Sequence, residues 1–420
     1  MPESSITTRS PFSSWVRIIR RPAISESSKP EARSLNPPLS GVYVHVPWCK
    51  ARCPYCAFAV DVRRARPYGA YTDALLREWA SCRALFPSPA TLFFGGGTPS
   101  LHPAEELARV VDAVAPTGEV AAEANPSDLG AFAALRRAGI TRLSIGAQTF
   151  DPATAARLGR RRDAALAREA VAAAREAGFR SVNVDLIFAV PGQTVARLEA
   201  DLDALLSARP DHVSLYGLTV EEGTAFARAK LPWTGDDDWR AMYDLAVERL
   251  AGDGLDRYEV SNFARAGHRC VHNEHYWRAR PWAGLGAAAH GFWPDGTRVV
   301  NVRDVDAYVA AADPAVSRER PSPRALATEL CWSTLRHVDG LDRAELRART
   351  GLDVRPPPAL LAAGLVAAQG DSLRLGPEGW ALADGVARRL ADTLETSDRV
   401  VGSSRPAPFV ESSRATIGRE

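Results

Sequence analysis

The sequence predicts an α/β fold: a partial (β/α)6 barrel followed by a C-terminal, helix-rich domain of winged-helix type. Three observations favour this fold class. Short apolar runs, many of them β-branched, recur six times between residues 41 and 220, as expected for buried parallel strands. Helical stretches with apolar residues at three- and four-residue spacing separate these runs. Beyond residue 220 the alternation stops.

The barrel elements are expected in strict alternation along the chain. The strands are Val42–Val46, Thr91–Phe94, Val120–Glu123, Arg142–Ile145, Val182–Ile187 and His212–Tyr216. The helices between them are Tyr71–Leu85, Ala104–Val114, Ser127–Ala138, Ala164–Ala177 and Val195–Leu206. Six units fall short of the eight that close a complete barrel, so an open barrel is predicted, with its active side at the carboxyl ends of the strands.

The remainder of the chain divides into further parts. A helix is expected over 236–251, an aromatic-, Gly- and His-rich stretch over 257–303, and helices over 324–337 and 342–349. Residues 359–390 are expected to hold a helix, a hairpin-like stretch at Ser372–Leu375 and a last helix. The predicted organisation is an extension (1–40), the barrel (41–220), a barrel-flanking region (221–320), the winged-helix-like domain (321–392) and a loose tail (393–420).

The composition is that of an ordinary globular protein. Hydrophobic residues make up 46% and charged residues 24% of the chain. A net charge of +2 gives no electrostatic case for binding nucleic acid or an anionic membrane. No run of 18 apolar residues suggests a membrane span. Residues 1–40 are rich in Ser, Pro and Arg, but acidic residues such as Glu3 argue against a transit peptide, and we expect a disordered extension on a cytoplasmic protein.

Three of the six cysteines form one short motif. Cys49, Cys53 and Cys56 follow the first strand with the spacing C-x3-C-x2-C. Three thiolates on one loop can ligate three irons of a [4Fe–4S] cube and leave the fourth iron open to a small molecule. One alternative is a zinc site, although structural zinc usually takes four ligands from paired knuckles. Another is inert core cysteines, against which the neighbouring charges of Lys50 and Arg52 argue.

Polar residues end several of the other strands. Gly95-Gly-Gly-Thr-Pro99 follows the second strand, and glycines let a backbone approach a ligand closely. Glu123 ends the third strand, Gln148 follows the fourth, Arg160 comes next in Leu-Gly-Arg, and Asp185 lies in the fifth. Buried charges need a partner or a ligand, so these groups predict a polar ligand in the barrel mouth. The alternative is an internal ion pair of Arg160 with Asp185 or Glu123.

The cysteine triplet after the first strand of a β/α series resembles the radical S-adenosylmethionine (SAM) superfamily, over about residues 41–390. The resemblance implies that SAM binds the open iron of the cluster and that the protein orients it and excludes water. It also implies a set of SAM contacts, namely Tyr43, Tyr55, Gly96, Gly97, Thr98, Glu123, Gln148, Arg160 and Asp185.

Within this superfamily the chain resembles the oxygen-independent coproporphyrinogen III oxidase group, and most closely its haem-chaperone (HemW) branch. Two features separate the branches. Phe58 stands where the oxidase carries a fourth cysteine, and residues 272–277 supply the H-N-x-x-Y-W motif of the chaperones. The other matching segments are Tyr-Val-His-Val-Pro-Trp-Cys49, Cys-Pro-Tyr-Cys56, Gly-Gly-Gly-Thr-Pro-Ser100, Leu-Ser-Ile-Gly-Ala-Gln-Thr-Phe150, Val-Pro-Gly-Gln-Thr194, Tyr-Glu-Val-Ser-Asn-Phe263 and Gly-Leu-Gly-Ala-Ala-Ala-His290.

The resemblance implies haem as a further ligand. His272 is the matching axial-ligand candidate, and the Tyr and Trp of its motif can pack on the porphyrin. His275 and Cys270 compete for the iron, and His290 is either structural or lines the pocket. The chain departs from most relatives at Arg162, where they carry a histidine two residues after Leu-Gly-Arg.

Two functions of different class follow from the resemblance, and whether the protein is an enzyme is left open. The first is a carrier that binds haem and hands it to an acceptor such as a respiratory membrane enzyme, with relatives suggesting a homodimer and with an electron donor left unidentified. The second is an enzyme that decarboxylates coproporphyrinogen III oxidatively through a 5′-deoxyadenosyl radical. A minor third is an anaerobic haem-degrading methylase. Phe58 and the complete motif at 272–277 favour the carrier.

Overall fold

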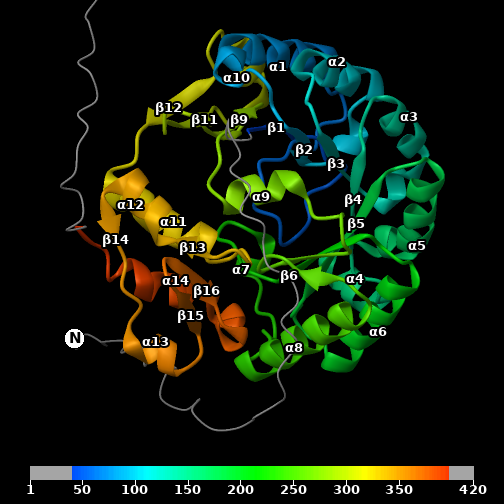
Figure 1. The fold of residues 1–420 in the computed structure, drawn as a ribbon. Helices are drawn as coiled ribbons and strands as arrows, with labels where there is room; N and C mark the ends of the chain where they lie inside the picture. Colours follow the sequence, from blue (N-terminus) through cyan, green and yellow to red (C-terminus); the bar gives the residue numbers. More distant parts are fainter. Residues whose placement is uncertain (1–39, 397–420) are drawn as a thin grey trace, which may run out of the picture. The chain divides into compact units, whose positions relative to one another are not determined.

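Six parallel strands form the centre of the fold. The computed structural model describes residues 40–396, and in it the strands follow one another in chain order across the sheet (Figure 1). They are β1 (Gly41–Val46), β2 (Thr91–Gly96), β3 (Glu119–Ala124), β4 (Arg142–Gln148), β5 (Ser181–Phe188) and β6 (His212–Gly217). Their carboxyl ends therefore meet along one edge, and the predicted partial (β/α)6 barrel is confirmed.

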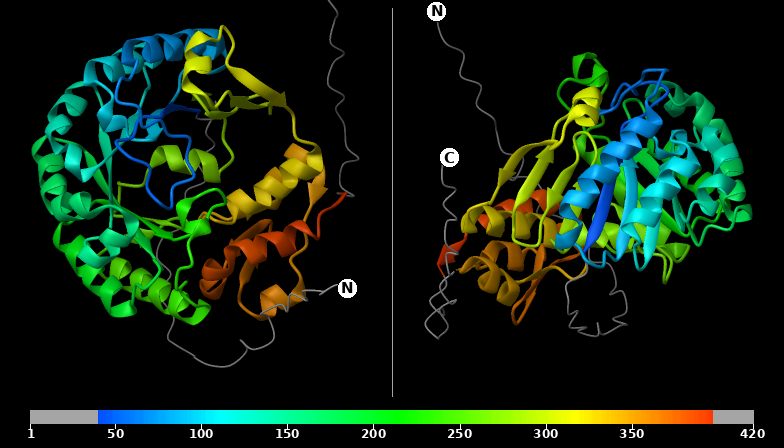
Figure 2. Two further views of the ribbon diagram at one scale, coloured as in Figure 1. Left: turned by 180° about the vertical axis from the view of Figure 1, so that it is seen from behind. Right: turned by 90° about the horizontal axis from the view of Figure 1, so that it is seen from above.

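Helices cover the outer face of these strands, as Figure 2 shows from two directions. They are α1 (Tyr68–Cys82), α2 (Ala104–Val114), α3 (Phe132–Arg137), α4 (Pro152–Leu158), α5 (Arg161–Glu176) and α6 (Val195–Ser207), with short 3-10 turns at Arg83–Leu85, Pro99–Leu101 and Pro126–Ala131. The helix predicted over Ser127–Ala138 begins as such a turn, because Pro126 and the non-helical Asp128 interrupt it. The short helix α4, capped by Asp151, was not predicted.

The sheet continues beyond both ends of the barrel. Beside β6 lie the antiparallel strands β8 (Asn262–Ala264) and β7 (Asp256–Arg257). Beside β1 lies β9 (Trp282–Leu285), which runs parallel to it, and antiparallel strands follow. These are β10 (His290–Phe292), β11 (Arg298–Asn301) and β12 (Ala315–Glu319), which complete a twelve-stranded sheet. The aromatic stretch 257–303 thus contains several short strands that the sequence did not indicate.

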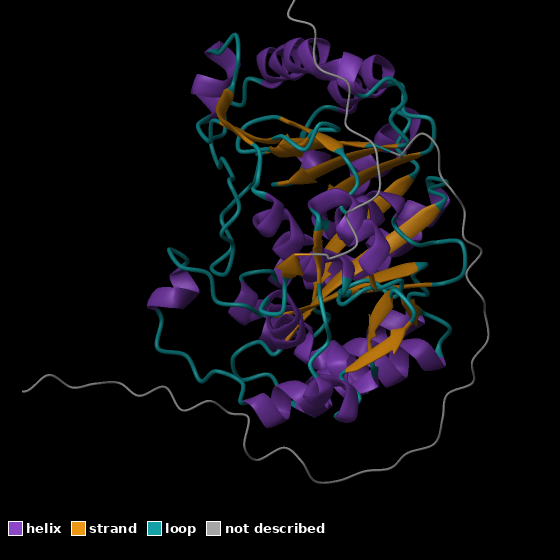
Figure 3. Ribbon diagram, turned by 60° about the vertical axis from the view of Figure 1, so that its left-hand side comes forward, coloured by secondary structure: helices purple, strands orange, loops and turns teal. Residues whose placement is uncertain are grey.

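The remaining elements flank the sheet or form the C-terminal module, which we define as residues 321–396. The flanking helices are α7 (Ala225–Arg228), α8 (Asp236–Gly252), α9 (Val271–Trp277) and α10 (Val305–Ala310). The module contains helices α11 (Pro323–Thr334), α12 (Arg343–Thr350), α13 (Pro358–Ala362) and α14 (Ala383–Ala391), a 3-10 turn at Pro377–Leu382, and strands β13 (Leu341–Asp342), β14 (Leu352–Asp353), β15 (Val366–Gln369), β16 (Ser372–Leu375) and β17 (Glu395–Thr396). Figure 3 shows this mixture of helices with short strands, which agrees with the helix-rich C-terminal region predicted.

Two large apolar cores lie within the described residues. The larger core lies between the parallel strands and their outer helices, where Val44, Leu92 and Leu143 are completely buried. The smaller core belongs to the C-terminal module and includes Leu335, Leu346 and Leu390. Burying side chains of this size contributes about 1.5–3 kcal/mol each, so both cores are substantial.

Two predictions concern parts of the chain that the structure describes only marginally. The predicted extension 1–40 and tail 393–420 lie outside the described residues, apart from residue 40 and residues 393–396. Within residues 40–396, none of the helices combines the length and the apolar character that crossing a membrane requires.

Candidate functional site

The cysteine loop leaves β1 at the carboxyl edge of the parallel strands. Backbone hydrogen bonds close it on itself, since Cys49 N–H donates to the Asp61 carbonyl at 2.9 Å and Asp61 N–H donates to the Pro47 carbonyl at 2.7 Å. Trp48 is completely buried, and its indole N–H donates to Nδ1 of His102 at 2.9 Å. The base of the loop is therefore fixed to the barrel.

Cys49, Cys53 and Cys56 are free, half-buried thiols on this loop. Cys56 N–H donates to the Cys53 carbonyl at 3.1 Å, which forms a tight turn between them. Burial raises the pKa of the Cys49 thiol, and the hydroxyl of Thr98 partly opposes that rise. Burial likewise raises the pKa of Cys56. Among residues 40–396, no three His, Cys, Asp or Glu side chains are grouped so as to hold a single metal ion.

A continuous series of polar contacts joins two of these sulfur atoms. Oγ1 of Thr98 lies 3.6 Å from Sγ of Cys49 and accepts a hydrogen bond from Nδ2 of Asn125 at 3.2 Å. Nη2 of Arg160 donates to Oδ1 of Asn125 at 2.7 Å, and Nη1 of Arg160 lies 4.0 Å from Sγ of Cys53. Iron-ligating thiolates are anionic, and a hydroxyl and a guanidinium beside the sulfur atoms stabilise that charge. The side chains present therefore fit a [4Fe–4S] cluster.

The glycine run at the end of β2 packs directly against the cysteine loop. Gly96 has a φ of +106°, and a Cβ added there would come within 2.3 Å of the His45 ring. A Cβ on Gly97 would lie 2.7 Å from the backbone of Pro47. The N–H of Gly96 donates to Oε2 of Glu123 at 3.1 Å. In this structure these glycines permit close packing, and the N–H of Gly96 is bonded within the protein.

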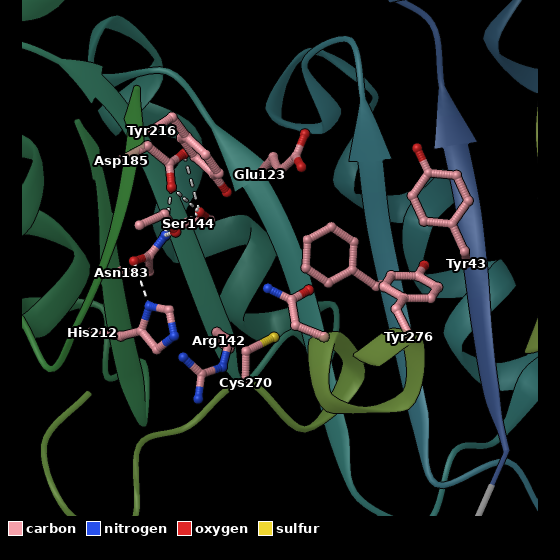
Figure 4. Close-up of a pocket in the computed structure, with 13 residues that line it drawn as sticks. Tyr43, Glu123, Arg142, Ser144, Asn183, Asp185, His212, Tyr216, Cys270 and Tyr276 are labelled. Carbon is pink, nitrogen blue, oxygen red and sulfur yellow. Dashed lines mark hydrogen bonds between the residues drawn. The ribbon is translucent and has the colours of Figure 1, made fainter. Parts of the chain in front are cut away.

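Glu123 and Asp185 border a cavity of about 190 Å³ inside the barrel (Figure 4). Burial raises the pKa of Glu123 to about 8, and the charge of Asp185 adds to the rise. Burial also raises the pKa of Asp185, although Ser144 donates to it at 3.2 Å and Asn183 donates to it at 2.6 Å. The cavity thus brings two carboxyl groups together in an environment that disfavours their charged forms.

The internal ion pair considered from the sequence is not the one that forms. Arg160 pairs with Asp163 at 3.2 Å and donates to the Gly146 carbonyl at 2.6 Å. Glu123 and Asp185 instead interact with backbone N–H, hydroxyl and amide groups. The alternative reading, in which Arg160 neutralises these acids directly, is therefore wrong for this structure.

The remaining residues expected near SAM lie along the same edge. Tyr43 lines the cavity, and its hydroxyl lies 3.1 Å from Nδ1 of His45. Tyr55 packs against Phe226 with ring centroids 6.2 Å apart. Gln148 ends β4 with a φ of +66°, a strained conformation for a residue other than glycine. Seven of the nine expected contacts therefore come from the carboxyl ends of the strands or the connections that follow them, whereas Tyr43 and Asp185 lie within β1 and β5.

The helix α9 carries the histidine motif, and His272 is completely buried in it. Nδ1 of His272 lies 2.8 Å from Oγ1 of Thr91, and Nε2 lies 2.8 Å from the hydroxyl of Tyr276. The imidazole ring also stacks on Phe93, with centroids 5.2 Å apart. Both ring nitrogens are thus already hydrogen-bonded, and an iron atom could reach His272 only after one of these bonds opened.

The other haem-ligand candidates differ in access. His275 is 3% exposed, and its Nδ1 lies 2.8 Å from the Val271 carbonyl. Cys270 is 3% exposed, and burial together with the charge of Glu119 raises the pKa of its thiol strongly. His290 is exposed on β10. Cys270 therefore lacks the thiolate character that would favour binding iron.

Two further positions singled out in the sequence have exposed side chains. Phe58 lies on the cysteine loop with 64% of its surface exposed. Arg162 is exposed in the first turn of α5. The side chain of Arg162 therefore extends into solvent beside Arg160, which reaches Cys53.

Sequence reasoning missed Asn125, which links Thr98 to Arg160. Its signal was its place in Glu-Ala-Asn-Pro126, where an amide directly follows a strand and precedes a proline. It also missed His212 in the cavity wall, which lies 2.6 Å from Oδ1 of Asn183 and 2.8 Å from the hydroxyl of Tyr258. A histidine inside an apolar strand gave little reason to look there.

Comparison with known proteins identifies relatives over most of the chain. Residues 43–205 match the family model described as the Radical SAM superfamily. The chain is 39% identical over 376 residues to the heme chaperone HemW of Mycobacterium tuberculosis (strain CDC 1551 / Oshkosh), which covers 83% of this chain and 94% of that protein. It is 35% identical over 286 residues to the heme chaperone HemW of Bacillus subtilis (strain 168), covering 64% and 75% of the two chains.

A solved structure shares the fold. The coproporphyrinogen III oxidase HemN from Escherichia coli, described as a radical SAM enzyme, superposes with a TM-score of 0.72 over 84% of this chain and 90% of that chain. The sequence identity is 19%, so this similarity establishes the common architecture, including the region beyond the parallel strands.

Proposed function

This chain belongs to the heme chaperone HemW family of the radical SAM superfamily, and from that premise we propose that it binds haem and transfers it to an acceptor protein. The observation that carries the proposal is the 39% identity to a heme chaperone across 94% of that protein's length. This similarity extends well beyond the parallel strands. The oxidase, in contrast, shares 19% identity, which supports a common fold only.

We propose that the thiols of Cys49, Cys53 and Cys56 hold a [4Fe–4S] cluster. Support comes from Thr98 beside Cys49 and from the guanidinium of Arg160 beside Cys53, since both groups favour thiolates. The cluster supplies one-electron chemistry and an open iron for SAM. Asn125 positions Thr98 and Arg160 at once, so it orders the side chains around two of the proposed ligands.

The proposed SAM contacts are the nine residues described above, most of them at the carboxyl edge of the strands. Glu123 and Asp185 support this proposal, because two buried carboxyl groups beside an open cavity suit an amino or hydroxyl group of a ligand. Gly96, Gly97 and Thr98 shape the approach to the cysteine loop. Gln148 ends β4, the side chain of Arg160 reaches the Gly146 carbonyl of that strand, and Tyr43 and Tyr55 flank the loop.

For the haem iron, the motif points to His272, and this assignment stays a prediction. The ligand role requires that Thr91 or Tyr276 release one of the two ring nitrogens. We propose that the acceptor is a haem protein, with a respiratory membrane enzyme as one example. We also propose that the chain acts in the cytoplasm and reaches a membrane only through such a partner. The electron donor is unassigned, and a homodimer is proposed from the family resemblance.

The test is an anaerobic titration of the reconstituted full-length protein with ferric haem. We expect saturable binding with a change in the Soret band, and transfer of the haem to an apo-haem protein added in excess. The Cys53→Ala variant should lose the brown chromophore of the cluster, whereas Cys331→Ala in the core of the C-terminal module should keep it. Failure to bind haem, or conversion of coproporphyrinogen III to protoporphyrinogen IX in the presence of SAM, would contradict the proposal.

A further inference from the structure

A series of buried polar side chains leads through the wall of the barrel cavity to Asp185. The hydroxyl of Tyr258 lies 2.8 Å from Nε2 of His212, and Nδ1 of His212 lies 2.6 Å from Oδ1 of Asn183. Nδ2 of Asn183 then donates to Oδ1 of Asp185 at 2.6 Å, and Figure 4 shows the part from His212 to Asp185. Tyr258, His212 and Asn183 are at most 4% exposed, so each depends on its neighbours in this series for its hydrogen bonds.

A main-chain donor fixes the end of the series at Tyr258. The N–H of Cys270 donates to the hydroxyl oxygen of Tyr258 at 3.3 Å. A backbone N–H can donate but cannot accept, so this bond has one direction. The hydroxyl hydrogen of Tyr258 therefore points away from Cys270, and its acceptor is Nε2 of His212.

His212 passes this direction on to Asn183. Burial lowers the pKa of His212 well below its usual value, and Arg142 and His268 add to the effect, so the imidazole is neutral and carries a single N–H. Because Nε2 accepts from Tyr258, that hydrogen is on Nδ1 and is donated to Oδ1 of Asn183. The side-chain oxygen of Asn183 therefore faces His212, and its amide hydrogens are left to donate on the other side.

Asp185 is the acceptor at the cavity end of the series. Nδ2 of Asn183 donates to Asp185 and also to the hydroxyl of Ser144 at 2.6 Å, and Ser144 donates in turn to Oδ2 of Asp185 at 3.3 Å. The reverse arrangement would turn the oxygen of Asn183 toward Asp185 and would require a protonated carboxyl. It would also make Nε2 of His212 a donor, so Tyr258 would lose the acceptor for its hydroxyl hydrogen. The bonds are therefore self-consistent with Asp185 as an acceptor beside the cavity.

We propose that Tyr258, His212 and Asn183 are positioning residues for SAM, because they hold Asp185 as a hydrogen-bond acceptor for a donor group of that ligand. This inference rests on the proposed function, in which Asp185 contacts SAM, and it names the residues that prepare this contact. A carboxylate that can only accept selects hydroxyl and amino groups, and SAM carries both. Because the three residues act through Asp185, their effect should appear in the affinity for SAM and in its dependence on pH.

Other ionisable groups near the series also respond to pH. Around Asp185 and His212 these groups are Glu123 on β3, Arg142 on β4, Arg160 before α5, Tyr216 on β6 and His268 before α9. Glu123, with a pKa of about 8, titrates in the wild type and in every variant alike. Each variant is therefore compared with the wild type at the same pH, so that the contribution of Glu123 cancels.

Asn183→Asp is the sharpest test, since it keeps the size of the side chain and replaces the amide donor with a second carboxyl group. Two neighbouring buried carboxylates resist being charged together, so the pair retains one proton to a higher pH. At about pH 8 the SAM affinity of the reconstituted, full-length protein should fall about tenfold or more. The difference from the wild type should shrink toward about pH 6, where a shared proton restores the hydrogen bond to Asp185. Anaerobic equilibrium dialysis with labelled SAM, normalised to cluster content, measures both effects.

Tyr258→Phe and Asn301→Asp complete the set of variants. Tyr258→Phe keeps the ring but removes the donor to His212, so the affinity for SAM should fall roughly threefold to fivefold. Asn301→Asp is the matched control. Asn301 is 2% exposed and donates to the carboxylate of Glu78 at 2.6 Å, but it does not line the cavity. This control should bind SAM with the affinity and pH dependence of the wild type.

The pH dependence separates a positioning role from a structural one. A loss of affinity in Asn183→Asp that is the same at every pH, or an equal loss in Asn301→Asp, would overturn the inference. Wild-type affinity in both Asn183→Asp and Tyr258→Phe would overturn it as well and would leave the proposed haem function intact, because haem binding is titrated separately. If the wild-type protein does not bind SAM, the SAM site and the positioning role fail together, and the haem titration still decides whether the protein is a carrier.

Discussion

Glu123 is the residue whose protonation matters most inside the barrel. With a pKa near 8, its carboxyl is mostly protonated at pH 7, so it can donate a hydrogen bond as well as accept the one from Gly96 N–H. Asp185, which accepts from hydroxyl and amide donors, is better suited to remain an acceptor. Two acids of similar chemistry thus offer different groups to a ligand, because their local partners differ.

Glu123→Gln should flatten the pH dependence of stability. In the unfolded chain the carboxyl loses its proton near pH 4.5, whereas in the folded protein it keeps it until about pH 8. The folded state therefore binds more protons in this window, and stability falls as the pH rises through it. The variant should be more stable than the wild type by roughly 1–2 kcal/mol at pH 8.5 and about equal to it at pH 4.5.

Thermal unfolding of both reconstituted proteins between pH 4.5 and 8.5, recorded anaerobically, measures this difference. The expected difference in stability is modest because the carboxyl faces a cavity in which water reduces the cost of its charge. A stability difference between the variant and the wild type that does not change with pH would contradict a raised pKa of Glu123.

Asn125→Ala should destabilise the proposed cluster. The substitution removes the hydrogen bonds to Thr98 and to Arg160 together. Leaving these groups without their partner costs about 1–3 kcal/mol of stability in this part of the site. Asn125→Asp retains an acceptor for Arg160 but removes the donor to Thr98, so its effect should be smaller. Cluster retention should be highest in the wild type, lower in Asn125→Asp and lowest in Asn125→Ala. It is measured by the iron and sulfide content and by the rate of cluster loss to a chelator. Equal cluster retention in all three would show that Asn125 has no positioning role.

At the scale of elements, the strands that the sequence revealed are those buried on both faces. Val42–Val46 and Val182–Ile187 are rich in apolar, β-branched residues, and their predicted bounds fall within β1 and β5. The strands β9 to β11 were missed because they are short and because glycines such as Gly284 and Gly291 interrupt their pattern. The pairing of β9 with β1 joins segments that are far apart in the sequence, and a local sequence pattern does not predict such contacts.

The same limit explains what could be foreseen of the site. The cysteines and the glycine run are local motifs, so their positions could be read directly. The engagement of both His272 nitrogens could not, because Thr91 is far away in the chain and only the fold brings it near. The exposure of His290 likewise depends on the pairing of β9 with β10.

The helix α9 is held by charged contacts with the C-terminal module. Oε1 of Glu274 lies 3.3 Å from Nε2 of His337 and 3.3 Å from Nη2 of Arg278. Burial opposes ionisation of Glu274, but His337 and Arg278 outweigh it and lower its pKa. The ionised carboxylate therefore stabilises the folded state at pH values above its usual pKa, and this contribution is lost as the pH falls through the lowered value.

Glu274→Ala should loosen α9 more than the rest of the barrel. We expect a loss of about 1–2 kcal/mol in unfolding free energy at pH 7, because His337 loses a buried partner. Hydrogen exchange should increase within Val271–Trp277, and the stability difference should shrink at acid pH. Glu248→Ala, at an exposed position on α8, is the control. Exchange that rises equally across the protein would point to general destabilisation instead.

At the scale of the whole molecule, the barrel and the C-terminal module have separate apolar cores but share a main-chain junction. Val260 N–H donates to the Arg336 carbonyl at 2.9 Å, and Val338 N–H donates to the Tyr258 carbonyl at 3.0 Å. Glu259 lies between these bonds and is completely buried. We therefore propose the boundary near residue 320 as one between units that fold around their own cores and associate tightly.

A protease site inserted between Arg320 and Pro321, in the exposed link before α11, tests this junction. After cleavage the two pieces should elute together from a sizing column, even in about 0.5 M NaCl, because main-chain hydrogen bonds resist screening better than surface ion pairs. Burial raises the pKa of Glu259 to about 7. Its carboxyl is therefore neutral in the folded state at pH 5.5 and charged at pH 8.5, so the pieces should separate more readily at the higher pH. Glu259→Gln should remove that pH dependence, and separation at pH 5.5 would contradict the junction described here.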